Sequence, residues 1–260
     1  MNDSNSWAPV IIEGRPVLNS LSVVIPAHDE AGNIEVLLNE VCDALRGRIE
    51  FEIVCVDDGS RDGTAGVLRS LLETMPELRA LRHEACSGQS VALLTAVRNA
   101  RHAWVVTLDG DGQNNPADIL GLVAELQCSP QDVRLMAGWR VKRNDDSGKR
   151  VASRLANRIR RALLKDGTPD TGCGIKLFER ELFLALPAFN HMHRYLPALV
   201  QRAGWRTVSV PVDHRPRGEG RSKYTNLGRA WVGMRDLLGV AWLIQRHVCA
   251  KSHAIKGVEP

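Results

Sequence analysis

The chain has 260 residues, of which 44% are hydrophobic and 25% are charged, and these values exclude a disordered or collagen-like chain. This length can bury a core without disulfide bonds. The 34 basic and 30 acidic residues give a net charge of +4. That balance suits anionic ligands and is too weak to indicate nucleic acid, so we expect no nucleic-acid partner.

The six cysteines form no C-x-x-C pair and have no zinc-ligand spacing. The N-terminus has no secretory signal, and reduced thiols in the cytoplasm are therefore the favoured interpretation. Apolar runs such as residues 237–244 are far shorter than the ~20 residues that a bilayer span needs. The sequence predicts a cytoplasmic protein that is not an integral membrane protein.

The first half alternates between two kinds of pattern. Residues 1–20 are polar, contain Pro9, Gly14 and Pro16, and are expected to form a flexible leader. Compact apolar runs then predict strands, and helical stripes between them predict helices: strands at 21–25, 51–56, 78–82 and 104–108, with helices at 30–45, 64–72 and 89–100. This rhythm predicts an α/β protein with a Rossmann-like, mostly parallel sheet flanked by helices.

The second half is more basic. Strands are predicted at 134–139, 175–178 and 208–212, and residues 140–161 are rich in arginine and lysine. Residues 226–260 form a predicted amphipathic helical tail, in which tryptophans such as Trp242 lie beside basic residues such as Arg246. Such a helix suits the headgroup layer of a membrane. Packing of the tail on the domain is the equally open alternative.

Acidic residues follow three of the predicted strands, as Asp29-Glu30, Asp57-Asp58 and the pair Asp109 and Asp111. Ligands of parallel sheets bind at the carboxyl ends of the strands, so these clusters predict one functional edge. In the segment V-V-T-L-D-G-D-G-Q, two carboxylates and Gln113 offer oxygen ligands to Mg²⁺ or Mn²⁺. A glycine-rich turn that merely caps the next helix is the alternative.

Three motifs occur together: S-V-V-I-P-A-H-D-E at 22–30, V-D-D-G-S-R-D-G-T at 56–64 and L-D-G-D-G-Q at 108–113. In this order and spacing the chain resembles the family 2 glycosyltransferases of the GT-A fold. D-T-G-C-G-I-K-L-F at 170–178 and R-P-R-G-E-G-R-S-K-Y at 215–224 are similar to the branch that contains dolichol-phosphate mannosyltransferase and bacterial polyprenyl-phosphate glycosyltransferases. The resemblance covers roughly residues 21–224.

The resemblance implies a role for each matching residue. The implied nucleotide-binding residues are Pro26, His28, Glu30, Asp57, Asp58 and Asp109, and the implied metal ligands are Asp109, Asp111 and Gln113. The implied catalytic residues are Asp111, Arg140, which faces the phosphates, and Asp170. The cofactor would be Mg²⁺ or Mn²⁺, which neutralises the departing diphosphate together with arginines.

A polyprenyl phosphate is already an anion and needs positioning rather than a catalytic base. The resemblance implies that the acceptor phosphate contacts Arg150, Ser153, Arg217, Ser222 and Lys223. It implies an inverting transfer of a sugar from a UDP- or GDP-sugar to an undecaprenyl or dolichyl phosphate. The expected location is the inner face of the cell membrane, where the protein is peripheral, with the membrane surface and a membrane partner protein as further partners.

We therefore expect a leader at 1–20, a GT-A domain at 21–225 and a tail at 226–260. Within the domain, the nucleotide-sugar half covers about 21–140 and the acceptor half about 141–225. One alternative is transfer to a hydroxyl of a lipid-linked or cell-envelope glycan, for which Asp170 is the candidate base. A non-catalytic nucleotide-sugar-binding protein is another. His191 and His193 are more typical of a helix start or surface loop than of a metal site, and they could border the acceptor groove.

Overall fold

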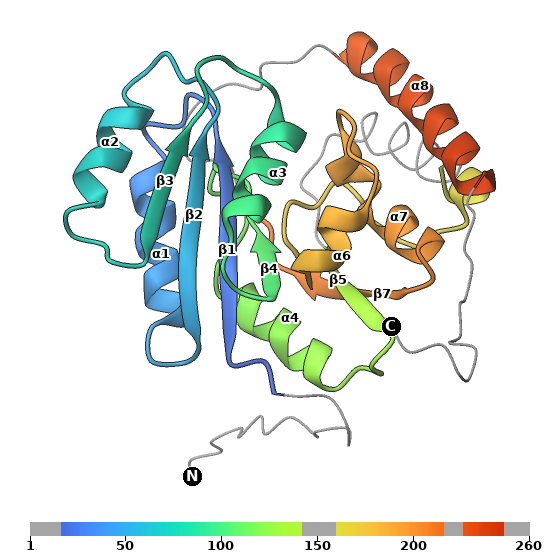
Figure 1. The fold of residues 1–260 in the computed structure, drawn as a ribbon, viewed down its shortest axis with the longest axis horizontal. Coiled ribbons are helices and arrows are strands. Elements are labelled where there is room, and N and C mark those ends of the chain that lie inside the picture. Colours follow the sequence, from blue (N-terminus) through green and yellow to red (C-terminus); the bar gives the residue numbers. More distant parts are fainter. Residues whose placement is uncertain (1–16, 142–159, 216–225, 247–260) are drawn as a thin grey trace, which may run out of the picture.

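A computed structural model of the protein describes residues 17–141, 160–215 and 226–246, and the side chains of 226–232 are left aside. These residues build one mixed seven-stranded sheet with helices on both faces (Figure 1). The predictions for residues 1–16, 142–159 and 216–225 concern residues that the structure does not describe, and so do the predictions for the end of the tail from 247 onward.

The strand order is β3-β2-β1-β4-β6-β5-β7. The strands are β1 (Ser20–Ala27), β2 (Glu50–Asp57), β3 (Leu78–Arg82), β4 (Trp104–Thr107), β5 (Val133–Arg140), β6 (Lys176–Glu179) and β7 (Arg206–Val212). Strands β1 to β4 are parallel, and β5 and β7 are parallel to each other. Strand β6 runs antiparallel to both of its neighbours, β4 and β5. The predicted mostly parallel sheet is confirmed.

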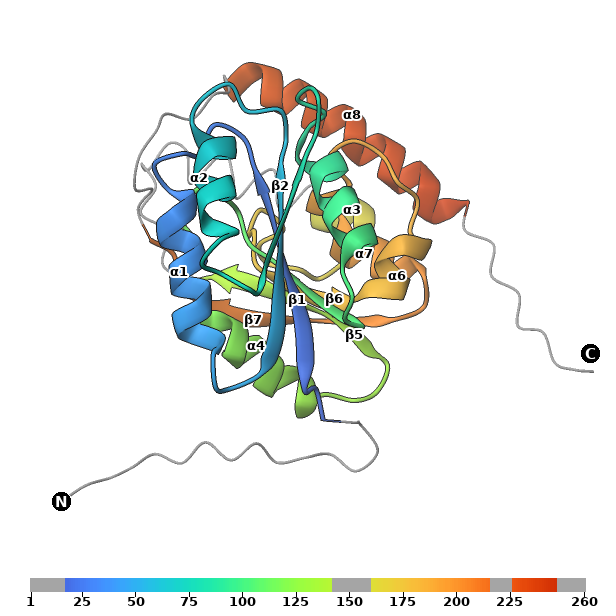
Figure 2. The same ribbon diagram turned by 60° about the vertical axis from the view of Figure 1, so that its left-hand side comes forward.

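Helices α1 (Ile34–Leu45), α2 (Thr64–Leu71) and α4 (Asp118–Gln127) pack on one face of the sheet. The other face carries α3 (Gln89–Asn99), α6 (Arg180–Ala185), α7 (Leu196–Arg202) and α8 (Asn226–Gln245). Between α6 and α7 lies a single 3₁₀ turn, η1 (Met192–Arg194). Figure 2 shows α1, α2 and α4 on one side of the strands and α3 and α8 on the other.

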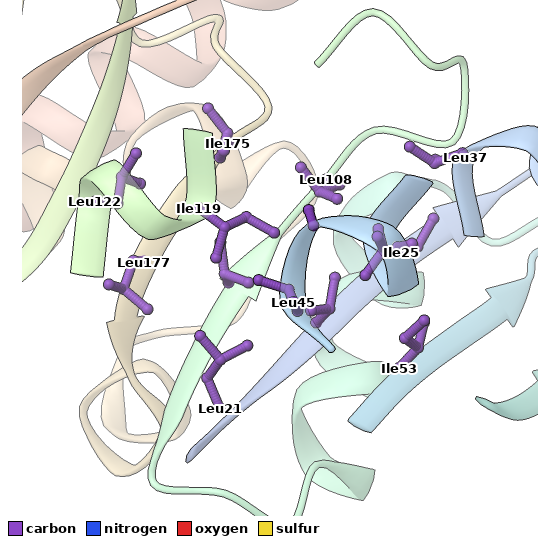
Figure 3. Close-up of a cluster of buried hydrophobic side chains, with 14 of the residues drawn as sticks. Leu21, Ile25, Leu37, Leu45, Ile53, Leu108, Ile119, Leu122, Ile175 and Leu177 are labelled. Carbon is purple, nitrogen blue, oxygen red and sulfur yellow. The ribbon is translucent and has the colours of Figure 1, made fainter. Parts of the chain in front are cut away.

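Strand β1 shows why the sheet needs helices on both faces. Successive side chains of a strand point to opposite faces. Val23 and Ile25 accordingly join the cluster beneath α1 and α4, whereas Val24 joins the cluster beneath α3, and all three are completely buried. Figure 3 shows the first cluster, where Ile25 and Leu45 gather with Leu108, just after β4, and with leucines and isoleucines of α4 and of the segment that leads into β6. A continuous β-branched run is what a strand buried on both sides requires.

The sequence did not predict α6, η1 or α7, and it indicated α4 only as a helix near Pro116. Helices α6 and α7 span six and seven residues, which is too short for a clear helical period. They bury Phe183 and Leu199 in the second cluster. Tertiary packing, rather than local pattern, therefore defines these elements.

Among the residues that the structure describes, no helix combines the length and apolarity that a membrane crossing requires.

Candidate active site

The direction of β6 brings two loops to the same edge of the sheet. Because β6 is antiparallel to β4, its first residue Lys176 pairs with Thr107, the last residue of β4. Thr107 Oγ1 donates a hydrogen bond of 2.5 Å to the carbonyl oxygen of Gly174. The segment before β6, which contains Asp170, therefore lies beside Asp109, just after β4.

A cavity of about 320 Å³ lies at this edge, on the α3 side of the sheet. Its polar wall combines residues from five parts of the chain, among them Gln89, Thr107, Asp109, Arg140, Asp170, Lys176, His193 and Arg194. Leu93 and Leu196 complete the wall on the apolar side. Three of the residues predicted from the sequence, Asp109, Arg140 and Asp170, thus line one cavity.

Asp109 is held firmly within the wall. Gln89 Nε2 donates to Asp109 Oδ1 at 2.8 Å, and the Asp109 backbone N–H donates to Asn114 Oδ1 at 3.3 Å. Burial and the negative charge of Asp111 raise the pKa of Asp109, while Lys176 and Arg140 act in the opposite direction. Two carboxylates that repel each other in this way favour a cation between them.

The fit to a divalent cation can be tested on Gly174. A Cβ atom at this glycine would lie 2.2 Å from Asp109 Oδ2 and 2.6 Å from Asn114 Oδ1, so the carboxylate occupies space that any side chain would fill. Mg²⁺ typically takes one or two carboxylates and completes its shell with water and substrate phosphates. Asp109 and Asp111 fit that arrangement. No group of three His, Cys, Asp or Glu side chains in the described part of the chain could hold a metal by itself.

Asp111 and Gln113 stand beside the cavity rather than in its wall. The Gln113 backbone N–H donates to Asp111 Oδ1 at 3.2 Å, and Gly112 between them has a φ of 71°. The Gln113 carbonyl oxygen accepts a hydrogen bond from the Arg215 backbone N–H. The loop thus positions the Asp111 carboxylate through its own backbone.

The ends of β1 and β2 bring together the residues predicted for the nucleotide. His28 Nδ1 lies 2.8 Å from the Asp58 carbonyl oxygen, and the Glu30 backbone N–H donates to Thr64 Oγ1 at 2.9 Å. Pro26 is the residue before the last in β1 and pairs with Val56 in β2. Pro26, His28 and Glu30 therefore lie next to the D-D-G-S loop, outside the wall of the cavity at β4.

The two aspartates at the end of β2 differ in their surroundings. Asp57 is 1% exposed, and its Oδ1 accepts the Ser60 backbone N–H at 2.9 Å. Its Oδ2 lies 3.3 Å from Arg82 Nε and makes no hydrogen bond with the described residues. Arg82 thus supplies a positive charge beside an oxygen that makes no hydrogen bond with the described residues.

Asp58, by contrast, anchors the loop before α3. Its carboxylate accepts hydrogen bonds from the backbone N–H groups of Ser87 and Gly88 at 2.9 and 2.8 Å, and it lies 2.7 Å from His83 Nδ1. Burial tends to raise the pKa of Asp58, but these hydrogen bonds outweigh it and hold the pKa below its ordinary value. Asp58 therefore fixes the position of the loop that leads into α3.

Arg140 and Asp170 form a two-pronged ion pair. Arg140 Nε and Nη2 donate to the two carboxylate oxygens of Asp170 at 2.7 and 2.9 Å, and Asp170 is 4% exposed. The Gly172 backbone N–H also donates to Asp170. The resemblance implies that Asp170 is a catalytic residue, and in the structure both of its carboxylate oxygens bind Arg140.

Sequence reasoning did not single out Lys176 and Ser90, and it treated His193 only as a residue bordering the groove. The Lys176 ammonium is buried and donates a hydrogen bond to the Cys173 carbonyl oxygen. Burial lowers the pKa of Lys176. Lys176 stands inside the quoted D-T-G-C-G-I-K motif, so the signal was present, whereas nothing in the sequence links Ser90 to a residue 103 positions away.

The predicted acceptor residues Arg150, Ser153, Arg217, Ser222 and Lys223 lie outside the described residues.

The family model described as Glycosyl transferase family 2 matches residues 22–186, which is more than half of the chain. The chain belongs to glycosyl transferase family 2. The matched range contains the D-D-G-S loop, the D-G-D-G-Q loop and the Asp170 segment. Family 2 membership thus agrees with the resemblance seen in the motifs.

Curated family 2 relatives have named activities. A dodecaprenyl-phosphate galacturonate synthase of Rhizobium johnstonii is 30% identical over 230 residues, covering 86% of this chain and 67% of the relative. An undecaprenyl-phosphate 4-deoxy-4-formamido-L-arabinose transferase of Edwardsiella ictaluri is 32% identical over 209 residues, covering 78% and 62%. The chain therefore spans about three fifths to two thirds of the length of these relatives.

Solved structures show the same fold. A mannosyltransferase from Pyrobaculum calidifontis, in complex with GDP-Man and Mn²⁺, has a TM-score of 0.62 at 25% identity and covers 89% of this chain and 65% of its own. Glucosyl-3-phosphoglycerate synthase from Mycobacterium tuberculosis has a TM-score of 0.64 at 19% identity, covering 87% and 80%. The expected GT-A fold is confirmed.

Proposed function

We propose that this protein is an inverting glycosyltransferase that moves a sugar from a UDP- or GDP-sugar to a polyprenyl phosphate with the help of Mg²⁺ or Mn²⁺. The observation that carries the proposal is the cavity in which Asp109, coupled to Asp111, faces a wall that holds Arg140 and Lys176. Both relatives described above are named for polyprenyl-phosphate products or acceptors, and the Pyrobaculum calidifontis neighbour was solved with a sugar nucleotide and Mn²⁺.

On this proposal, Asp109 and Asp111 hold the cation, with Gln113 at its edge. Bound there, the ion supplies the positive charge that stabilises the departing diphosphate. Arg140 and Lys176 add fixed positive charge to the same cavity, where low dielectric strengthens their effect on a developing anion. Asp57, whose Oδ2 lies 3.3 Å from Arg82 Nε and makes no hydrogen bond with the described residues, accepts a donor group of the nucleotide, next to Pro26, His28 and Glu30. Asp58 supports this pocket by holding the loop before α3.

The state of Asp170 favours a phosphate acceptor. A catalytic base needs a free lone pair directed at the proton that it removes. Both Asp170 oxygens already accept hydrogen bonds from Arg140. A phosphate oxygen attacks without losing a proton, so it needs no such base.

We infer that residues 141–225 supply the acceptor side, with Arg150, Ser153, Arg217, Ser222 and Lys223 as its phosphate ligands, opposite a donor side at 21–140.

A polyprenyl acceptor also requires a membrane surface. We propose that the protein is peripheral at the inner face of the cell membrane, with α8 turned to the headgroups. Met234, Leu238 and Trp242 form the apolar stripe of α8, spaced four residues apart on its outer face, and they are 43%, 58% and 61% exposed. Arg235 and Arg246 are exposed beside the stripe, which suits an anionic bilayer. A membrane partner protein is a further candidate for the same stripe.

Transfer to a sugar hydroxyl is the second candidate, and His193 is the observation that favours it. Burial lowers the pKa of His193 well below its ordinary value, so the imidazole is neutral. Its Nδ1 lies 2.7 Å from Ser90 Oγ, and its ring lines the cavity. If Nδ1–H donates to Ser90, Nε2 carries the free lone pair that a base requires.

The test is transfer of labelled sugar from UDP- and GDP-sugars to undecaprenyl phosphate in the presence of Mn²⁺. We expect Asp111→Asn to lower kcat/KM at least 100-fold, and chelation by EDTA to abolish transfer, because the diphosphate charge is then unscreened. Asp132→Asn, at a half-exposed carboxylate far from the cavity, is the matched control. Wild-type-like transfer by Asp111→Asn would contradict the proposal. Transfer only to glycan hydroxyls, with loss of activity in His193→Gln, would favour the second candidate.

A further inference from the structure

Turn η1 contributes His193 and Arg194 to the wall of the cavity, and the turn with its two flanking residues is held at three points. His191 Nδ1 lies 2.8 Å from Asp236 Oδ2 of α8, and His193 Nδ1 lies 2.7 Å from Ser90 Oγ of α3. The Tyr195 hydroxyl donates to the Gly233 carbonyl oxygen at 3.2 Å. Met192 is buried beneath the turn. These contacts fix the turn between two helices without any ligand.

The fixed turn directs two polar side chains to the cavity, those of His193 and Arg194. Ser90 is 4% exposed, so its hydroxyl holds Nδ1 of His193 away from solvent. Among the described residues, no hydrogen bond reaches the other ring nitrogen, Nε2. His193 therefore offers Nε2 to whatever fills the cavity.

The charges of the wall are unequal. Three cationic side chains, Arg140, Lys176 and Arg194, stand against the two carboxylates Asp109 and Asp170.

Two of these three cations are already engaged. Arg140 is bound by both oxygens of Asp170, and Lys176 donates to the Cys173 carbonyl oxygen. Arg194 makes no ion pair or side-chain hydrogen bond with the residues that the structure describes. Arg194 is partly buried, and a guanidinium that lines a cavity without a carboxylate partner is available to an anionic group of a ligand.

We propose that Arg194 and His193 form an oxyanion subsite on η1, separate from the metal-binding loop, which binds a carboxylate or phosphate group of a substrate. The inference rests on the proposed function, in which the cation at Asp109 and Asp111 accounts for the diphosphate and leaves Arg194 for a second anion. The planar guanidinium suits two oxygens of one oxyanion. Nε2–H of His193 adds a neutral donor when the Ser90 hydroxyl donates to Nδ1.

Two substrate groups have this chemistry, namely the carboxylate of an acidic donor sugar and the phosphate of the lipid acceptor. Kinetics of Arg194→Gln distinguish them. If the acceptor phosphate binds there, KM for undecaprenyl phosphate rises about tenfold or more with every donor. If a sugar carboxylate binds there, KM rises only for a uronate donor such as UDP-glucuronate, and UDP-glucose is unaffected. Arg194→Lys keeps the positive charge but loses the planar guanidinium that can bind two oxygens at once. Its KM should therefore lie between those of the wild type and Arg194→Gln.

Binding measurements keep this test separate from the test of the proposed function. Farnesyl phosphate and UDP-glucuronate with Mn²⁺ are titrated calorimetrically into the wild type, Arg194→Gln and the control Arg69→Gln. Arg69 is exposed on α2, far from the cavity, so this variant removes the same charge elsewhere.

Weaker binding in Arg194→Gln alone, by about tenfold for one of the two ligands, supports the subsite even if no transfer is seen. Equal binding by the wild type and Arg194→Gln, or no binding of either ligand to the wild type, overturns it. Melting temperatures of all the variants check that each is folded.

Discussion

Gly174 shows how closely a single residue controls the candidate site. Its Cα faces the Asp109 carboxylate so closely that a Cβ would lie 2.2 Å from Oδ2, a separation that van der Waals contact does not allow. The neighbour is a carboxylate that is itself fixed by Gln89, so it has little freedom to move aside. The geometry of the carboxylate pair therefore depends on a residue that carries no functional group.

We predict that Gly174→Ala weakens Mn²⁺-dependent binding of UDP at least tenfold, because Asp109 is pushed off its position. Calorimetric titration of UDP with and without Mn²⁺ measures the effect. Gly66→Ala is the matched control, since a Cβ at this helical glycine meets nothing within 4 Å. It should bind normally and be more stable by about 1 kcal/mol. Normal Mn²⁺ dependence in Gly174→Ala would contradict the placement of the cation.

Asp58 makes a second prediction at the residue scale, this one about stability. Asp58→Asn should lower the free energy of unfolding by about 2 kcal/mol near neutral pH, because backbone donors of Ser87 and Gly88 lose a charged acceptor. The folded pKa of Asp58 lies below its ordinary value of 3.8, so its stabilisation is present above that pH and is lost as the pH falls further.

Urea unfolding of the wild type and of Asp58→Asn at pH 7 and at pH 3 measures this difference. The gap between the two proteins should narrow at the lower pH. Glu73→Gln, at an exposed carboxylate, is the control. A gap that stayed constant with pH would mean that the loop is held by something other than the ionised carboxylate.

At the scale of elements, α8 unites the two interpretations that the sequence left open for the tail. Leu237, Val240 and Ala241 are buried against the second core cluster, so the helix packs on the domain. Its opposite side carries the apolar stripe of Met234, Leu238 and Trp242. Helix α8 therefore has apolar residues on two sides, one packed on the domain and one exposed. Because both sides are apolar, the sequence of the helix shows only a weak amphipathic pattern.

Leu238→Glu should lower partitioning onto vesicles with anionic lipid about tenfold or more, because a buried leucine contributes about 1.5–3 kcal/mol. Sedimentation with vesicles measures the bound fraction. The control is Val36→Glu, which adds the same charge at an exposed apolar residue of α1, on the other face of the sheet. Equal partitioning of both variants and the wild type would exclude the stripe as the membrane contact.

Most strands were predictable because buried parallel strands have continuous apolar runs with sharp ends. Strand β1 begins at Ser20 and β2 at Glu50, one residue before the predicted starts. The short helices were not predictable, since six or seven residues give no clear period. The sequence also did not predict the partners of the site residues. Asp170 binds Arg140, which is 30 positions away in the chain. Asp58 rather than Asp57 contacts the loop before α3, and this choice depends on packing that no local pattern encodes.

At the scale of the whole molecule, the two core clusters lie on opposite faces of a single sheet, and the cavity opens on only one of them. Val106 and Leu177 point to the α1 and α4 side, whereas Thr107 and Lys176 line the cavity on the α3 side. The face covered by α1 and α4 therefore contains packed core side chains, whereas the face covered by α3 contains core side chains and the cavity. The order of strands along the chain predicted the sheet, but the reversed β6 is a property of the complete topology.

Because β6 is reversed, its register with β4 joins the segment around Asp109 to the segment that contains Asp170. The pairing of Thr107 with Lys176 sets which side chains of the two strands share a face. A slip of one residue would turn the Lys176 ammonium toward the apolar core beneath α1 and place an isoleucine or leucine in the cavity wall. The position of the Lys176 ammonium in the cavity wall therefore depends on hydrogen bonds between the backbones of β4 and β6, and a change in the surrounding loops that preserves this pairing leaves Lys176 in place.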